Sequence, residues 1–85
     1  MEVALSPKFL RLFKKLDPAL KQETREKIKL FQDDHKNPIL KTHSLKGRLQ
    51  GLHSFSVNYK IRIVFTYENK DSAIFLAIGS HDIYK

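Results

Sequence analysis

The chain has 85 residues, with 16 lysines and arginines against nine aspartates and glutamates, which gives a formal net charge of +7 at pH 7. We expect a single domain over residues 1–85, because a chain of this length buries only one modest core. Such a domain has no room for a large enclosed substrate cavity, so an active site would be an open surface groove. The absence of cysteine excludes disulfides, thiolate nucleophiles and cysteine-based zinc sites.

The excess of positive charge favours a polyanionic partner, such as nucleic acid, an anionic membrane or an acidic protein. No run of apolar residues approaches the roughly 18 that a membrane span needs. The first residues, MEVALSPKFLRLFKK, mix basic with apolar positions. A secretory signal instead places its basic residues before an uninterrupted apolar stretch. We therefore expect a cytoplasmic protein with no membrane partner.

The first half of the sequence predicts one strand and two helices. Residues 1–5 are short and mostly apolar, as in a strand. Ser6-Pro7 and Asp17-Pro18 each combine a capping side chain with proline at the first helical position. Helical spacing after each start predicts a helical hairpin joined by a tight turn. The inward positions are Phe9, Leu10, Phe13, Leu16, Leu20, Thr24, Ile28 and Phe31. The polar stretch 32–41 predicts a loop.

The second half predicts three strands, over residues 52–57, 59–67 and 72–78. The last of these, SAIFLAI, is apolar on both faces and should be the most buried. The order β-α-α-β-β-β predicts an α+β fold, with a small, mainly antiparallel sheet and the helical hairpin packed on one face. The opposite face would carry Lys60 and Arg62, which alternate with apolar residues, and is the candidate groove.

Several kinds of chemistry have no support in the sequence. The spacings of His43, His53 and His81 match no common metal site, so no metal is expected. There is no GxGxxG, P-loop or GxSxG motif. We therefore expect neither a small-molecule cofactor nor a serine hydrolase.

Cleavage of RNA is different, because RNA carries its own nucleophile, the 2′-hydroxyl. An enzyme then needs a base for that hydroxyl, an acid for the leaving 5′-oxygen, and cations for the charge on the phosphate. Arg62 is a candidate phosphate ligand with a planar, permanently charged guanidinium. His81 directly follows a predicted buried strand, and its ordinary pKa suits acid–base work. Tyr84 could stack on a base or bind phosphate.

Other residues are candidates for the same surface. His43 and His53 are further possible bases, and Lys46, Arg48 and Lys60 are possible RNA phosphate contacts. Each candidate also has a plain structural reading. Arg62 could form a surface ion pair, His81 could cap a strand end, Tyr84 could pack under the last turn, and the lysines could serve solubility.

Two segments, SLKGRLQGLHSFSVNYKIRIVFTY and LAIGSHDIYK, resemble the RelE/ParE toxin superfamily. The resemblance is to the RelE-type mRNA interferases of toxin–antitoxin operons. It rests on LKG before a strand, on the strand YKIRIVF and on the ending IGSHDIYK, and with the order of elements it covers the whole chain. It implies a toxin that enters the ribosomal A site and cuts mRNA. It also implies a basic surface that meets ribosomal RNA and mRNA, and a cognate antitoxin that covers the groove.

The resemblance also implies residue roles. Arg62 matches the strand arginine that contacts phosphate, and His81 matches a position that acts as acid or phosphate ligand. Tyr84 matches the aromatic residue that positions mRNA, although one residue fewer separates it from Asp82. His43 matches a histidine found in the histidine-rich branch of the family.

This sequence departs from the family at the positions that supply the general base. Ser54 and Ser56 stand where some members carry lysines that act as base and charge stabiliser. The base therefore remains open among His43, His53 and His81. A weakly active or strongly ribosome-dependent enzyme is the expectation.

Two alternatives to an mRNA interferase remain open. One is a ParE-like toxin, which shares the fold but binds DNA gyrase. The other is a catalytically inactive relative that binds only an antitoxin. The combination of Arg62 with the His81 and Tyr84 ending favours RNA cleavage, since gyrase inhibitors of this fold need no such cluster.

Overall fold

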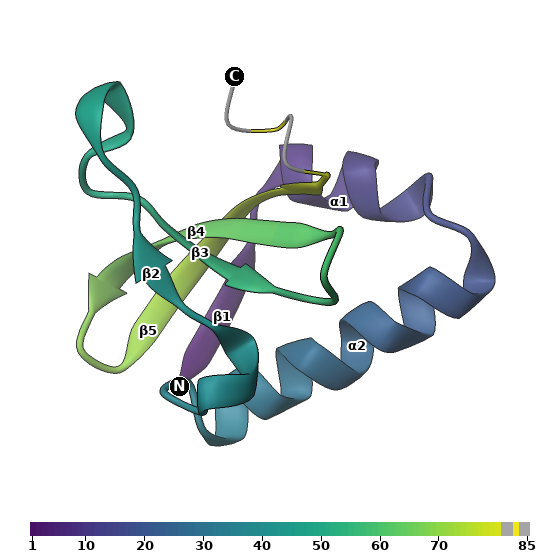
Figure 1. The fold of residues 1–85 in the computed structure, drawn as a ribbon, viewed down its shortest axis with the longest axis horizontal. Coiled ribbons are helices and arrows are strands. Elements are labelled where there is room, and N and C mark those ends of the chain that lie inside the picture. The colour runs from purple at the N-terminus through teal and green to yellow at the C-terminus, as the bar shows by residue number, and fades with distance from the viewer. Residues whose placement is uncertain (81–82, 84–85) are drawn as a thin grey trace.

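The computed structural model describes residues 1–80 and 83 (Figure 1). The elements are β1 (Glu2–Leu5), α1 (Pro7–Lys14), α2 (Pro18–Asp33), the 3₁₀ turn η1 (Pro38–Leu40), β2 (His43–Ser44), the 3₁₀ turn η2 (Gly47–Leu49), β3 (His53–Ser56), β4 (Arg62–Asn69) and β5 (Ser72–Gly79). The strands form one five-stranded sheet in the order β1-β5-β4-β3-β2. β1 pairs with β5 in parallel and the other neighbours are antiparallel. The predicted α+β fold is confirmed.

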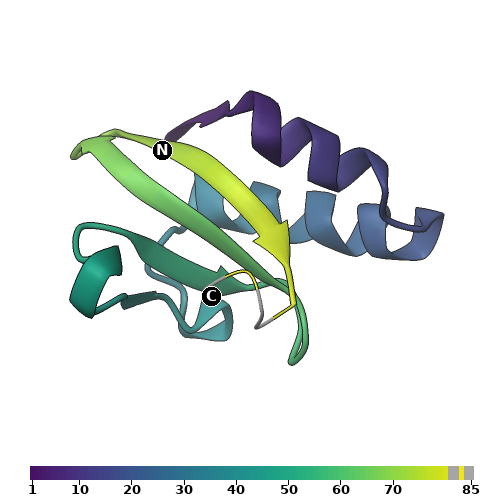
Figure 2. The same cartoon turned by 90° about the horizontal axis from the view of Figure 1, so that it is seen from above.

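Both helices begin where the sequence predicts. The Ser6 hydroxyl accepts a hydrogen bond from the Phe9 N–H at 3.0 Å, and Asp17 Oδ1 accepts one from the Leu20 N–H at 2.8 Å. Each cap satisfies a backbone donor that the first helical turn leaves unpaired. The helices lie on the same side of the sheet (Figure 2). Within the described part of the chain, no helix is long and apolar enough to cross a bilayer.

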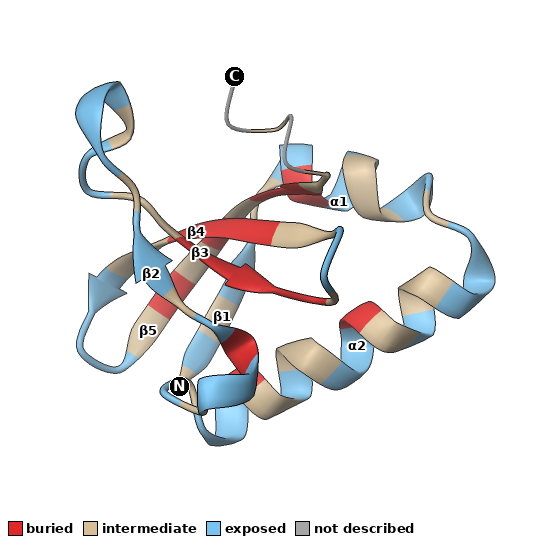
Figure 3. Ribbon diagram, viewed as in Figure 1, coloured by how far each residue is buried: buried red, intermediate tan, exposed pale blue. Residues whose placement is uncertain are grey.

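The core lies between these helices and the sheet, where buried residues gather in Figure 3. Its centre is Phe31 of α2, whose ring centroid lies 5.0 Å from those of Phe55 and Phe65 and 5.3 Å from that of Phe75. Phe9 of α1 packs on Phe75 at 5.7 Å. These five rings fill the space between the helices and one face of the sheet, and in the described part of the chain neither α1 nor α2 covers the opposite face.

The structure differs from the predicted elements in three places. The strand predicted from residue 59 starts only at Arg62, because the Val57 N–H donates to the Ile61 carbonyl at 2.9 Å and closes a turn. Lys60 therefore lies in that turn, not on the strand face beside Arg62. The short strand β2 pairs with β3 at the edge of the sheet, where no strand was predicted. Leu40, in the predicted polar loop, is fully buried.

Candidate functional site

The face of the sheet that carries no helix is organised in two cross-strand rows. Directly opposed residues in antiparallel strands project from the same face of a sheet. Ser56 on β3 is opposite Arg62 on β4, which is opposite Gly79 on β5. The sheet therefore puts the predicted phosphate ligand next to the end of the last strand.

The second row lies beside the first. His43 on β2 is opposite Ser54 on β3, which is opposite Val64 on β4 and then Ala77 on β5. Because side chains alternate along a strand, the second row shares its face with Arg62, two residues before Val64. The structure thus brings His43 and Arg62 onto one face, although 19 positions separate them in the sequence.

Arg62 is half-buried and held by the backbone. Its Nη1 donates a hydrogen bond to the Asn58 carbonyl at 2.6 Å. A carbonyl is a neutral acceptor, so this bond orients the guanidinium without neutralising its charge. A guanidinium has five N–H donors in a fixed fork that matches phosphate oxygens. Among the described residues Arg62 forms no ion pair, and both interpretations of it stay predictions.

His43 is exposed, and its ring nitrogen Nδ1 lies 3.2 Å from the Lys41 carbonyl oxygen. A carbonyl oxygen only accepts hydrogen bonds, so Nδ1 must carry the proton of the neutral ring. The lone pair then lies on Nε2. A neutral imidazole in this tautomer can accept a proton at Nε2, which is what a general base does.

The two serines of this face carry no charge and are buried. Ser54 is fully buried and Ser56 is 8% exposed. Ser54 is the second residue of β3 and Ser56 is its last, and both are paired with β4. The departure seen in the sequence is therefore on the candidate face itself, and no lysine from β3 supplies charge there.

Ile83, which is described after β5, lies against this face. The Ile83 N–H donates to the Ser80 carbonyl at 3.0 Å. A Cβ at Gly79 would collide with the Ile83 side chain, which would have to shift. Ile83 also lines an apolar groove of about 430 Å³, floored by Val64, Leu76 and Ala77. The predicted site residues His81 and Tyr84 lie outside the described residues.

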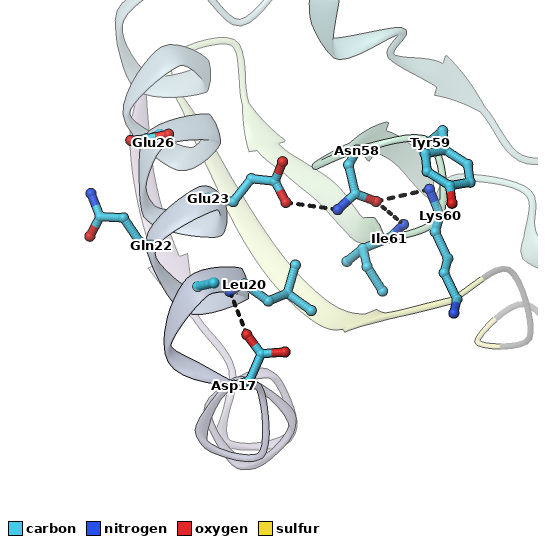
Figure 4. Close-up of a pocket in the computed structure, with 10 residues that line it drawn as sticks. Asp17, Leu20, Gln22, Glu23, Glu26, Asn58, Tyr59, Lys60 and Ile61 are labelled. Atoms are coloured by element: carbon cyan, nitrogen blue, oxygen red, sulfur yellow. Dashed lines mark hydrogen bonds between the residues drawn. The ribbon is translucent and has the colours of Figure 1, made fainter.

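The remaining predicted RNA contacts fall in different places. Lys46 and Arg48 are exposed in and before η2, between Leu45 and Leu49 of the groove wall. Lys60 is exposed in the turn beside α2 (Figure 4). His53 lies on the helix side of the sheet, where its ring stacks on Phe65 at 5.5 Å. It is not brought together with Arg62.

Charge is distributed unevenly along the chain. Residues 35–67, which supply β2, β3 and most of β4, contain six lysines and arginines and no aspartate or glutamate. These are Lys36, Lys41, Lys46, Arg48, Lys60 and Arg62. Helix α2, on the other side of the sheet, carries Glu23, Glu26 and Asp33 together with four lysines and arginines. Segment 35–67 therefore differs from α2 in having no acidic residue to offset its positive charge, which favours the approach of a polyanion.

Sequence reasoning missed Asn58, whose carbonyl holds Arg62. An asparagine between two predicted strands is a turn signal, because its side chain bonds to the backbone two or three residues on. That signal was present in the sequence. The link from the turn to Arg62 was not, because it depends on where the arginine side chain folds.

No protein-family model matches this sequence, and no curated protein matches it significantly. Solved structures do match. YafQ from E. coli is 14% identical with a TM-score of 0.80, and covers 98% of this chain and 96% of its own. A copper-bound mutant toxin from Helicobacter pylori is 20% identical, with a TM-score of 0.75 and coverage of 100% and 99%.

A third structure is the heterotetrameric YoeB–YefM toxin–antitoxin complex from Staphylococcus aureus. It is 21% identical, with a TM-score of 0.74 and coverage of 95% and 97%. At these identities the likeness establishes the fold alone. The chain therefore has the fold of the RelE/ParE toxins, and the resemblance predicted from its motifs is confirmed at that level.

Proposed function

We propose that this protein is the toxin of a type II toxin–antitoxin pair and that it is a ribosome-dependent, metal-independent endoribonuclease that cleaves mRNA in the A site. The proposed partners are mRNA, ribosomal RNA and a cognate antitoxin, and the proposed location is the cytoplasm, where ribosomes are. The antitoxin is supported by the YoeB–YefM complex, whose toxin has the same fold.

The observation that carries this proposal is the row formed by Ser56, Arg62 and Gly79. It puts a backbone-held arginine opposite the residue at which the last strand ends. His81, the proposed acid, follows Gly79 by two residues in the sequence. A phosphate ligand and a titratable imidazole are the parts that cleavage by the 2′-hydroxyl requires.

The proposed reaction begins at the 2′-hydroxyl. His43 Nε2 removes its proton, the 2′-oxygen bonds to phosphorus, and Arg62 stabilises the charge that develops on the phosphate oxygens. The bond from phosphorus to the 5′-oxygen then breaks, and His81 donates the proton that this oxygen takes up. The products are a 2′,3′-cyclic phosphate and a 5′-hydroxyl, and no metal takes part.

The other predicted residues bind and orient the RNA. Tyr84 stacks on a base of the mRNA. Lys46 and Arg48 contact backbone phosphates from the exposed loop beside the groove. Because β3 presents Ser54 and Ser56 on this face, the face has fewer charged groups, and we expect the ribosome to supply part of the orientation of the mRNA.

Primer extension on an mRNA in a purified translation system tests the proposal. We expect cuts at A-site codons that require ribosomes. His43→Ala, His81→Ala and Arg62→Ala should each lower the cleavage rate by about 100-fold or more, as loss of an acid–base group or of a charge-stabilising donor does.

Lys29→Ala is the matched control, since Lys29 is an exposed cation on α2 that pairs with Asp33 at 3.3 Å. It should cut like the wild type. Intact mRNA with the wild-type protein, or cuts that persist in Arg62→Ala, would overturn the assignment. Gyrase supercoiling in the presence of the protein would then be measured next, because the ParE-like reading shares this fold.

A further inference from the structure

We infer that Asn58 is a positioning residue, which sets the orientation of the Arg62 guanidinium and couples it to helix α2 through Glu23. The catalytic part of this inference rests on the proposed function. The structural part, that Asn58 and Glu23 hold Arg62, does not depend on it.

Three hydrogen bonds of the Asn58 side chain define its conformation (Figure 4). Its Oδ1 accepts from the backbone N–H groups of Lys60 at 2.8 Å and Ile61 at 2.7 Å. Its Nδ2 donates to Glu23 Oε1 on α2 at 2.8 Å. The side chain thus organises its own turn and fastens that turn to a helix 35 positions earlier in the sequence.

The backbone of the same residue holds Arg62, because the Asn58 carbonyl accepts the bond from Arg62 Nη1 at 2.6 Å. The Asn58 carbonyl lies in the peptide plane that joins Asn58 to the next residue, and the hydrogen bonds of the turn hold that part of the chain in place. A continuous set of hydrogen bonds therefore runs from Glu23 through Asn58 to the guanidinium. Movement of the turn relative to α2 would move the acceptor on which the arginine rests.

Asn58 also gives the Glu23 carboxylate and the Arg62 guanidinium separate hydrogen-bond partners. An amide donor occupies the Glu23 carboxylate, and a neutral carbonyl accepts from Arg62. Among the described residues neither side chain forms an ion pair. Asn58 thus orients the guanidinium while its full charge is kept for an anion. An arginine paired directly with a carboxylate would have to break that pair to bind phosphate.

The test uses variants that remove one or all of the hydrogen bonds of the Asn58 side chain. Glu23→Ala removes the acceptor for Asn58, whereas Glu23→Gln keeps an oxygen there. Glu26→Ala is the matched control, because Glu26 lies on the same helix and lines the same surface pocket without bonding to Asn58 within the described structure. Asn58→Ala removes the turn bonds together with the bond to α2.

The first readout is the mobility of the Arg62 Nε–H group, measured by ¹⁵N NMR relaxation in the RNA-free protein. We expect it to become mobile in Asn58→Ala and in Glu23→Ala, and to remain rigid in Glu23→Gln and Glu26→Ala. A guanidinium that stays rigid in Glu23→Ala would overturn the coupling to α2. This measurement stands even if Asn58→Ala does not fold or the protein cuts no RNA.

The second readout is mRNA cleavage at matched concentrations of folded protein. We expect kcat to fall by about 10- to 100-fold in Glu23→Ala with little change in KM, because misplacement of a catalytic group has effects of that size. Glu23→Gln should restore the wild-type rate. A mobile Arg62 with an unchanged kcat would overturn the catalytic role of Asn58. A wild-type protein that leaves mRNA intact would instead refute the proposed function.

Discussion

At the scale of single residues, Tyr67 shows how the helix side of the sheet differs from the open face. Its ring lies 4.8 Å from that of His53 and 5.2 Å from that of Phe65. Burial removes water from its hydroxyl and raises the pKa of Tyr67 above the usual 10.0. Tyr67 is therefore neutral at physiological pH. It belongs with His53 to the packing of the core, and not to the proposed chemistry.

Tyr67→Phe should reduce the loss of stability at alkaline pH. Below the unfolded pKa near 10 both states are protonated, so the ionisation has no effect there. Above it the unfolded state loses its proton first, and the folded state loses stability until its own raised pKa is passed. Chemical denaturation at about pH 8 and pH 10.5 measures this. Tyr59→Phe is the control, since Tyr59 is 90% exposed, and an equal alkaline loss in both variants would contradict the prediction.

At the scale of elements, the start of α1 is hydrogen-bonded to a β-bulge in β5. Val64 is opposite Ala77 and Phe65 is opposite Phe75, so Leu76 of β5 has no opposite residue on β4. The Leu76 carbonyl accepts a hydrogen bond from the Ser6 hydroxyl at 3.1 Å. The same hydroxyl caps α1. Ser6 thus stabilises a helix start and an irregular strand together.

Ser6→Ala should destabilise the fold by about 1–2 kcal/mol, because it removes a helix cap and a partly buried hydrogen bond together. For a domain of this size that corresponds to a fall of about 5–10 °C in Tm, which thermal unfolding followed by circular dichroism measures. Ser6→Thr keeps the hydroxyl and should recover most of the loss. A melting temperature of Ser6→Ala equal to that of the wild type would show that the two bonds contribute nothing.

At the scale of the whole molecule, the acidic residues are distributed unevenly. The acid-free segment, residues 35–67, builds the edge and centre of the sheet, whereas α2 carries three of the nine acidic residues beside four lysines and arginines. We therefore expect a polyanion to bind at the β2 and β3 edge, where no acidic residue of the segment opposes it. The apolar groove beside η2 lies along the same approach.

RNA affinity should depend on salt through Lys46 and Arg48. Each phosphate contact with single-stranded RNA contributes about −0.7 to the slope of log K against log salt. The double variant Lys46→Gln/Arg48→Gln should therefore have a slope shallower by about 1.4, as measured by fluorescence anisotropy with an RNA oligonucleotide. Lys29→Gln on α2 should leave the slope unchanged. Equal slopes for both variants would place the RNA on another surface.

The sequence by itself determined the local structure and the class of fold. Capping side chains followed by proline predicted both helix starts, because a helix end must satisfy its own backbone donors. Alternation and apolar runs predicted the strands of the second half. The motif around Arg62 led to the RelE/ParE fold, which the solved structures confirm. All of these signals depend on neighbours within a few residues.

Only the tertiary structure decided which side chains share a face. His53 turned to the helix side because β3 pairs it with Phe65, and Lys60 left the strand face because Asn58 folds residues 58–61 into a turn. The bulge at Leu76 and the burial of Leu40 likewise depend on distant partners. A shift of one residue in strand register exchanges the two faces of a sheet. The register is selected by the packing of Phe31 against three strands at once, which no short stretch of sequence contains.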